Sequence, residues 1–287
     1  MSQYIPPTMA SAADQKVALL DHIIVLVPHA ELKDPPKALT DNFNITNGGR
    51  HADGKTENKL IVFKDGSYIE IISFIDDLPE NRADHWWGSK PYGIIDWAFT
   101  NGIDYNSNYE ALISRLADVQ GDSSGAYSYA PPRTGGRIRP DGVKLEWAVT
   151  FPTNKEGNDT ETKRPSNLPF YCHDITPREN RVNGETEHPC GAVGIREVLA
   201  LVDDPQTEFF AGLIRAAVNS VNTEGNGGGI QVGTPHGAPS VISFVAPTSD
   251  AEKNEASLHK FVLKELKFDY GSNNVSGGIK FSYPFQD

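Results

Sequence analysis

The chain has 287 residues, a hydrophobic share of 38%, a charged share of 22% and a formal net charge of -12. This composition is typical of a soluble globular protein with one or two domains. The acidic balance argues against nucleic acid and anionic membranes as partners, because the net field repels phosphate. No stretch is apolar for long enough to span a bilayer, so we expect a cytoplasmic protein with a disordered leader at residues 1–17.

Two segments of the chain resemble each other. GGRHADGKTENKLIVF at Gly48 to Phe63 returns, altered, as GGRIRPDGVKLEWAVTF at Gly135 to Phe151. Both begin with Gly-Gly-Arg, contain an Asp-Gly turn and lead through Lys-Leu into an apolar run, which predicts a hairpin entering a buried strand. The sequence therefore contains an internal duplication.

The flanks of both segments extend the duplication. An apolar strand is predicted before each copy and another after it. The crossover between the first two strands is interrupted by Pro35 and Pro36 in the first copy, whereas it predicts an amphipathic helix in the second. Each unit therefore reads strand, helix, strand, strand, strand. The outer strands are predicted at Leu19–Val27, Ser67–Phe74, Gly93–Asn101 and Leu168–Ile175.

The rest of the chain repeats this order only loosely. A strand at Gly194–Val202 precedes an amphipathic helix, and a later helix is predicted from about Ala251 to Leu266. The polar segment Thr153–Asn167 is predicted to be a surface insertion. We divide the chain into a leader (1–17), a first βαβββ unit (18–90), a second unit (91–187) and a degenerate C-terminal α+β unit (188–287).

Together these motifs resemble the glyoxalase-like domain family of the vicinal oxygen chelate superfamily. The resemblance rests on LDHIIVLVP, GGRHADGKTENKLIVF, YIEIISF, RIRPDGVKLEW and EHPCGAVGI, and it covers most of Leu20 to Val202. It implies an α+β fold in which paired βαβββ units form a cupped mixed sheet. It also implies a cleft for a small-molecule substrate, often with a divalent metal ion, and a homodimer as one option, because such units often pair across chains.

Two polar residues lie in predicted strands that are otherwise apolar. His22 stands on an apolar strand face, and Glu70 lies in the middle of YIEIISF. A buried carboxylate without a partner is costly, so Glu70 needs a cation or a hydrogen-bond donor. We expect Glu70 and His22 to be catalytic. The alternatives are that His22 caps the end of the strand and that Glu70 forms an ion pair with Arg50 or Arg137.

The alignment of the two units sets Asp96 against His22 and His173 against Glu70. In the family that this chain resembles, metal ligands come from the first and last strands of each unit. The resemblance therefore implies a set of metal ligands consisting of His22, Glu70, Asp96 and His173, which suits Zn, Ni, Mn, Fe or Mg. This set departs from the usual pattern of the family, so a site without any ion stays open. The alternatives are that Asp96 caps a turn and that His173 is exposed.

A further set of residues is expected to contact the substrate. Arg137 and Arg139 offer planar, two-pronged donors for a carboxylate, unless they pair with the nearby Asp141. The tryptophans could wall the pocket, although core packing is the simpler explanation for them. The expected substrate-binding residues are Arg137, Arg139, His51, Asn58, His188, Trp97 and Trp147.

These residues lead to three hypotheses about function. No GxSxG elbow, Walker loop, dinucleotide fingerprint or HExxH motif is present. The resemblance implies a metal-dependent isomerase or lyase that acts on a small carbonyl compound through a metal-stabilised enediolate, with Glu70 as the base. One alternative is an enzyme of the same fold that uses His22 and Glu70 for acid–base chemistry without a metal. The other is a protein that binds and sequesters a small molecule.

Overall fold

The computed structural model describes residues 17–121, 126–139, 141–154, 167–220, 229–271 and 280–285. The predicted leader lies almost entirely outside these described residues, and so does most of the predicted insertion at Thr153–Asn167. No helix in the described part of the chain is long and apolar enough to cross a membrane.

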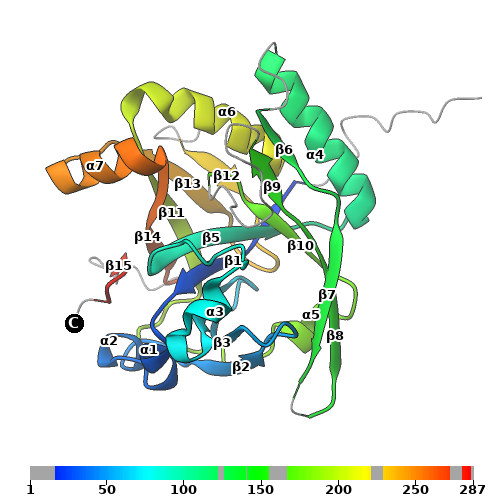
Figure 1. The fold of residues 1–287 in the computed structure, drawn as a ribbon, viewed down its shortest axis with the longest axis vertical. Coiled ribbons are helices and arrows are strands. Elements are labelled where there is room, and N and C mark those ends of the chain that lie inside the picture. The colour runs from blue at the N-terminus through cyan, green and yellow to red at the C-terminus, as the bar shows by residue number, and fades with distance from the viewer. Residues whose placement is uncertain are drawn as a thin grey trace, which may run out of the picture.

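Two similar halves form one eight-stranded mixed sheet with the order β2-β3-β4-β1-β5-β10-β8-β7 (Figure 1). The first half consists of β1 (Leu19–Leu26), β2 (Thr46–Arg50), β3 (Thr56–Val62) and β4 (Tyr68–Phe74), and the second of β5 (Gly93–Thr100), β7 (Arg133–Ile138), β8 (Lys144–Thr150) and β10 (Phe170–Asp174). The first strand of each half lies at the centre of the sheet and runs parallel to the last strand of that half. The predicted fold class, paired βαβββ units, is confirmed.

Both Gly-Gly-Arg hairpins form as predicted. β2 pairs with β3, and β7 with β8, each in antiparallel register. Gly54 and Gly142 in the turns have φ values of 70° and 86°, in the left-handed region that glycine adopts without strain. Arg137 on β7 donates an Nη1 hydrogen bond to the carbonyl of Gly48 on β2. Because β2 and β7 are the two edges of the sheet, this contact helps to close the curled sheet.

The crossovers differ between the halves. In the first half the proline pair separates two short helices, α1 (His29–Lys33) and α2 (Lys37–Thr40). In the second half α4 (Tyr105–Gln120) is a continuous helix that buries Leu112 and Leu116. The remaining short elements of this region are η2 (Ile75–Asp77), α3 (Pro79–Arg82), β6 (Tyr127–Tyr129), β9 (Pro152–Asn154) and α5 (Arg178–Arg181).

The C-terminal part forms a second, five-stranded sheet with the order β12-β13-β11-β14-β15. Its elements are β11 (Gly194–Val202), η4 (Asp204–Gln206), α6 (Thr207–Val218), β12 (Ile230–Val232), β13 (Ser240–Val245), α7 (Asp250–His259), β14 (Phe261–Asp269) and β15 (Lys280–Phe281). The helix predicted to continue to Leu266 is wrong beyond His259. Lys260 has a φ of 63°, which ends the helix, and β14 then pairs with β11 and buries Phe261 and Leu263.

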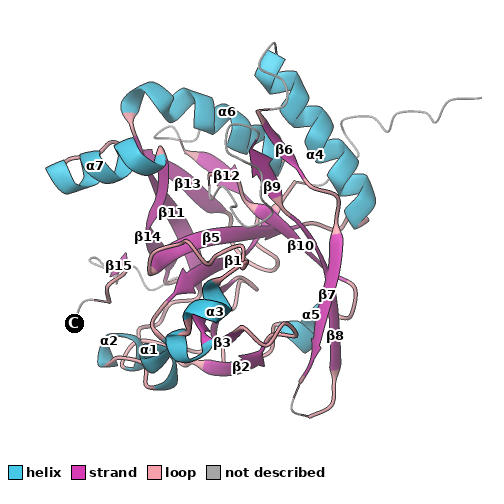
Figure 2. Cartoon of the chain, viewed as in Figure 1, coloured by secondary structure: helices cyan, strands magenta, loops and turns pink. Residues whose placement is uncertain are grey.

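The two sheets share one large hydrophobic core. It joins Ile23 and Val25 of β1 with the buried sides of α6, β11 and β14. Ile24 and Leu26 of β1 belong to a second cluster on the other face of the strand, together with Phe170 and Cys172. Helices α4, α6 and α7 lie on the opposite side of the molecule from the short helices α1 to α3 (Figure 2). The strands of the curled eight-stranded sheet line a cavity.

Candidate active site

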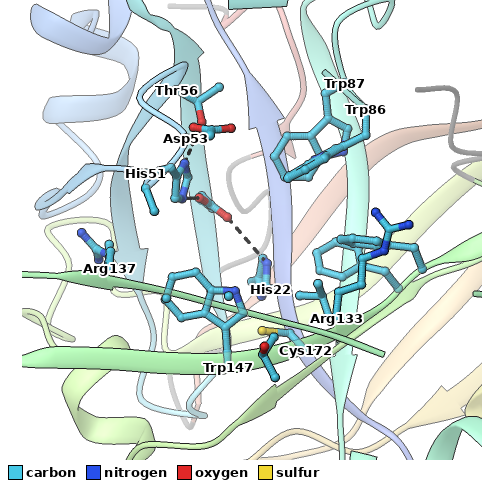
Figure 3. Close-up of a pocket in the computed structure, with 18 of the residues that line it drawn as sticks. His22, His51, Asp53, Thr56, Trp86, Trp87, Arg133, Arg137, Trp147 and Cys172 are labelled. Atoms are coloured by element: carbon cyan, nitrogen blue, oxygen red, sulfur yellow. Dashed lines mark hydrogen bonds and ion pairs between the residues drawn. The ribbon is translucent and has the colours of Figure 1, made fainter. Parts of the chain in front are cut away.

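A cavity of about 620 Å³ is lined by strands from both halves of the large sheet (Figure 3). Its wall is largely apolar and includes the rings of Trp86, Trp147, Phe151 and Phe170. The volume is that of a typical site for a small organic molecule. Charged side chains, including Glu70, also line the cavity, and they are the groups that could take part in a reaction there.

Glu70, on β4, is held in the cavity wall by three side chains. Its side chain is 9% exposed, and its Oε2 lies 3.6 Å from His22 Nε2. Its Oε1 lies 3.5 Å from His51 Nε2 and accepts a hydrogen bond of 2.5 Å from Asn58 Nδ2. Figure 3 labels His22 and His51, and a dashed line leaves the ring of each; both of these contacts are with Glu70. In the described part of the chain no ion pair joins Glu70 to Arg137, so the partners of the carboxylate are imidazole and amide groups.

His22 is oriented by the residue before it. The register of β1 against β5 shifts between Leu20 and His22, and such a bulge re-aims side chains. Nδ1 of His22 lies 2.5 Å from Oδ2 of Asp21, and the ring stacks on Tyr68 with 4.6 Å between centroids. Since Nδ1 points at the carboxylate of Asp21, Nε2 is the ring nitrogen that faces Glu70.

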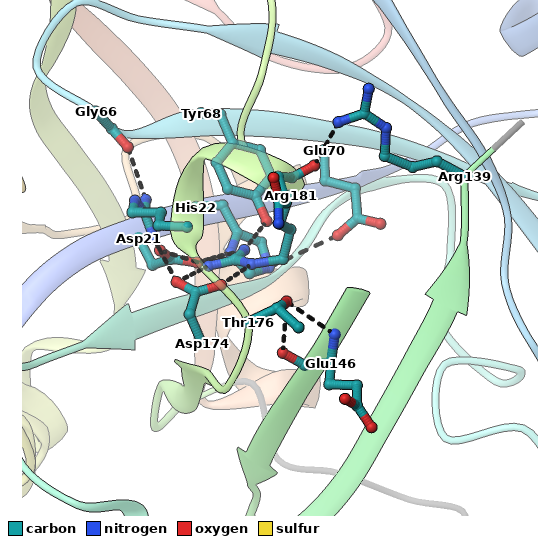
Figure 4. A network of polar contacts seen from close by, with 12 residues as sticks. Asp21, His22, Gly66, Tyr68, Glu70, Arg139, Glu146, Asp174, Thr176 and Arg181 are labelled. Carbon is teal, nitrogen blue, oxygen red and sulfur yellow. Dashed lines mark hydrogen bonds and ion pairs between the residues drawn. The ribbon is translucent and has the colours of Figure 1, made fainter. Parts of the chain in front are cut away.

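Asp21 is part of a buried network with arginines from α5 (Figure 4). Burial alone would raise the pKa of Asp21, but the guanidinium groups of Arg178 and Arg181 outweigh it and hold that pKa well below the ordinary 3.8. Arg181 also bonds both oxygens of Asp174, at 2.6 and 2.9 Å, and donates to the hydroxyl of Tyr68 at 2.6 Å. Asp21 is therefore ionised and fixed in place.

Both predicted catalytic residues line the cavity, and so do several of the predicted substrate contacts. Arg137 is half-buried beside β2, and burial lowers the pKa of its guanidinium group. Trp147 contributes an indole ring from β8. The predicted residues that line the cavity are His22, Glu70, His51, Asn58, Arg137 and Trp147.

Arg139, His188 and Trp97 lie outside the cavity. Arg139 pairs with Asp141 in the turn of its hairpin. His188 is buried and uses both ring nitrogens for hydrogen bonds to backbone groups. Trp97 is fully buried in the large core. Turn pairing and core packing thus account for these three side chains.

The four predicted metal ligands do not converge. Oδ2 of Asp96 accepts a hydrogen bond of 2.8 Å from Trp87 Nε1, and Oδ1 accepts one of 2.9 Å from the backbone N–H of Trp97. His173 is buried, with Nε2 3.1 Å from Asn101 Oδ1. Neither Asp96 nor His173 lines the cavity. Of the four, His22 and Glu70 alone reach it.

Strand register explains the position of His173. In the antiparallel pairing of β1 with β5, His22 lies opposite Ala98 and Ile24 lies opposite Asp96, with a register shift on the outer side of each pair. His22 and Asp96 therefore hold equivalent positions in the two halves, in agreement with the sequence alignment. Glu70 lies beside the residue two places after His22, and Phe170 lies beside the residue two places after Asp96. The counterpart of Glu70 in the second half is thus Phe170, not His173, and a phenyl ring cannot ligate a metal ion.

The side chains present do not fit the metal ion that the fold family implies. Among the described residues, no group of three or more His, Cys, Asp and Glu side chains is arranged to hold a metal ion. Cys172 lines the cavity, but burial raises the pKa of its thiol to about 12, which disfavours the thiolate needed for ligation. The donor set of this cavity therefore favours chemistry carried by the side chains themselves.

The sequence reasoning missed the residues that orient His22. Strict alternation along a strand places Asp21 on the face opposite His22, so the sequence does not indicate a contact between the two side chains. The bulge between Leu20 and His22 interrupts this alternation and allows the contact. Arg178 and Arg181 come from a short helix far along the chain. Their spacing of three residues directly after a strand, in DITPRENR, is a signal that both guanidinium groups point the same way.

The described residues form paired βαβββ units with a cavity between the two halves. A protein-family model for the glyoxalase-like domain matches residues 20–214, which is more than half of the chain. The chain therefore belongs to the glyoxalase-like domain family, as its motifs indicate. No curated protein matches the sequence significantly.

Solved structures with a similar fold are distant in sequence. A hypothetical protein from Staphylococcus aureus is 14% identical, with a TM-score of 0.54 over 80% of this chain and 87% of that chain. A mutant 4-hydroxymandelate synthase from Streptomyces coelicolor is 13% identical, with a TM-score of 0.49 over 88% of this chain and 71% of that chain. A methylmalonyl-CoA epimerase variant from Streptomyces coelicolor is 12% identical, with a TM-score of 0.31 over 56% of this chain and all (100%) of that chain. At these identities the likeness concerns the fold alone.

Proposed function

We propose that this protein is an enzyme that moves a proton at a carbon next to a carbonyl group, with Glu70 as the base and no resident metal ion. The observation that carries the proposal is the position of the carboxylate, which lies in the wall of an aromatic cavity between the Nε2 atoms of two imidazole rings. A carboxylate shielded from water and held by an amide is a suitable general base. The reaction class is isomerisation or elimination.

The neighbours of Glu70 supply the other roles. Removal of the proton leaves negative charge on the carbonyl oxygen of the substrate, and a fixed N–H donor stabilises that charge. The guanidinium group of Arg137, which lines the same cavity, carries such N–H donors, whereas His22, whose Nδ1 proton is held by Asp21, presents Nε2 as an acceptor. Asn58 keeps the carboxylate oriented through Oε1. The proton on Glu70 then returns to the same or a neighbouring carbon, or a leaving group departs.

The wall of the cavity indicates the kind of substrate. The rings of Trp86, Trp147, Phe151 and Phe170 suit an apolar or aromatic body. Arg137 faces this space as a half-buried guanidinium group and suits a carboxylate on the substrate. We therefore propose a small carbonyl compound that carries an apolar or aromatic group and an acidic substituent.

The test is proton exchange in heavy water. Chelator-treated protein is incubated with a panel of aryl and alkyl keto acids and ketones, and NMR follows the hydrogen next to the carbonyl. We expect the wild type to exchange it, and Glu70→Gln to lower the rate by about 10²- to 10⁴-fold. Glu146→Gln is the matched control, because Glu146 is a half-exposed carboxylate on β8 that does not line the cavity.

Two outcomes would contradict the proposal. Exchange that appears only after a divalent metal is added would support the metal-dependent reaction of the same fold. Tight binding of panel compounds without exchange would support a binding or sequestration protein.

A further inference from the structure

His51 differs from the other groups around the carboxylate in its access to solvent. The side chain of His51 is 23% exposed, whereas those of Glu70 and His22 are 9% and 4% exposed. His51 lies directly after β2, at the start of the hairpin turn, where its backbone N–H bonds the carbonyl of Thr56 at 2.9 Å. Among the described side chains in contact with the Glu70 carboxylate, His51 is therefore the one that offers a proton a path toward water.

His22 cannot serve as that exit. Its Nδ1 is bound to Asp21, which is 0% exposed and itself enclosed by Arg178 and Arg181. An ionised carboxylate accepts hydrogen bonds but does not donate them, so Nδ1 of His22 keeps its proton. A proton that passes from Glu70 to Nε2 of His22 can therefore only return the same way.

His51 has a partner that works in both directions. Its Nδ1 lies 2.7 Å from Oγ1 of Thr56, and its Nε2 lies 3.5 Å from Oε1 of Glu70. A hydroxyl group both donates and accepts. When Glu70 is ionised, Nε2–H faces it and Nδ1 accepts from Thr56. When Glu70 is protonated, Nε2 accepts and Nδ1–H points to Thr56, so both tautomers of His51 are satisfied.

We propose that His51 is the proton relay between Glu70 and solvent, with Thr56 as the partner that permits both tautomers. This inference rests on the proposed function, because Glu70 must first take up a proton. The substrate C–H proton moves to the carboxylate, and His51 changes from its Nε2–H to its Nδ1–H tautomer by exchange with solvent. The O–H proton of Glu70 then moves to the free Nε2 of His51. The imidazolium ring then releases one proton to water, which restores the starting state. No electron is transferred and no other reactant is needed.

The first test needs no substrate. The protein is labelled with ¹⁵N in its histidines, 8 in number, and spectra that connect ring nitrogens to ring protons report the tautomer of each ring. The signals are assigned by their loss in His51→Gln and His22→Gln. We expect His22 to be a fixed Nδ1–H tautomer. His51 should be mainly the Nε2–H tautomer in exchange with a minor Nδ1–H form, because the base is ionised before it takes up a proton. In Thr56→Val, His51 should become a fixed Nε2–H tautomer.

Either of two results would overturn the relay. One is the absence of any exchange between the two tautomers of His51 in the wild type, and the other is an unchanged His51 signal in Thr56→Val. These results concern the relay and leave the role of Glu70 open.

The second test uses the exchange reaction. His51→Gln should lower the rate of deuterium exchange by about tenfold or more, and free imidazole in the buffer should restore most of it. His259→Gln, which changes an exposed histidine at the end of α7, should have the wild-type rate. A His51→Gln protein that is slow but not rescued by imidazole would show a structural role and overturn the relay.

The two proposals fail in different ways. If Glu70→Gln keeps the wild-type exchange rate, the base has been assigned wrongly and the proposed function falls. If Glu70→Gln is inactive while His51→Gln exchanges at the wild-type rate, the base stands and the relay is refuted.

Discussion

His173 is expected to make the folded protein sensitive to acid. It lies on β10 with 4% of its surface exposed, and its Nδ1 has no hydrogen-bond partner among the residues that the structure describes. Burial lowers the pKa of His173 from the ordinary 6.5 to about 4. The neutral ring is therefore the form that the fold accommodates.

The size and sign of the effect follow from linkage. A pKa that falls from 6.5 to about 4 corresponds to about 3 kcal/mol, at about 1.4 kcal/mol for each tenfold change in proton affinity. Below about pH 6.5 the unfolded chain binds a proton at His173 that the folded chain does not bind. The free energy of unfolding should therefore fall as the pH drops from about 6.5, and this contribution should level off near pH 4.

The assay is urea unfolding between about pH 7 and pH 4, with His173→Phe as the comparison. Phenylalanine keeps an aromatic contact with Tyr171, whose ring stacks on His173 at 5.7 Å. Asn101 Oδ1 loses its contact with Nε2 but still accepts a hydrogen bond from the backbone N–H of Ile103. The wild type should lose about 2 to 3 kcal/mol more than the variant over this range. Equal losses in the two proteins would refute the reasoning, and an NMR titration of His173 would give its pKa directly.

Three other changes test the packing around the site. Arg181→Met removes the charged hydrogen bonds of Arg181 to Asp21 and Asp174, both of which keep Arg178 as a partner, and should lower the free energy of unfolding by about 1.5 to 3 kcal/mol in urea; a loss below about 0.5 kcal/mol would contradict the buried network. Gly48→Ala would place a Cβ 1.9 Å from Oδ1 of Asn58, so this amide must move and the melting temperature should drop, whereas an unchanged melting temperature would argue against the contact. With its pKa raised to about 12, the thiol of Cys172 should resist iodoacetamide at about pH 8, while half-buried Cys190 reacts; mass spectrometry showing Cys172 modified first would oppose this.

The fold could be predicted because its signals are local and occur twice. Each hairpin has an Asp-Gly turn next to alternating apolar residues, and both turns form with glycine in the left-handed region. The helix predicted beyond His259 failed for a different reason. Phe261 and Leu263 are two residues apart, as on one face of a strand, whereas Leu263 and Leu266 are three apart, as on one face of a helix, so the period of this short stretch is ambiguous. Pairing with β11, which is distant in sequence, makes the segment a strand.

The site could be predicted in part. His22 and Glu70 stand out because they are polar residues in apolar strands, and the cavity brings them together. The offset of His173 was not visible, because motif alignment cannot fix the register of β10 against β5. The roles of Asp21 and Arg181 depend on a bulge and on a contact across 160 residues of sequence. Neither a bulge nor a long-range contact produces a periodic pattern in the sequence.

The central claim is that a carboxylate flanked by two imidazoles acts as a base without a metal ion. The most direct measurement determines the metal content and the deuterium exchange rate on the same sample, before and after chelator treatment, beside Glu70→Gln. The account predicts wild-type exchange that is unaffected by removal of metal and is lost in the variant. Exchange that disappears with the metal and returns when the metal is restored would contradict it.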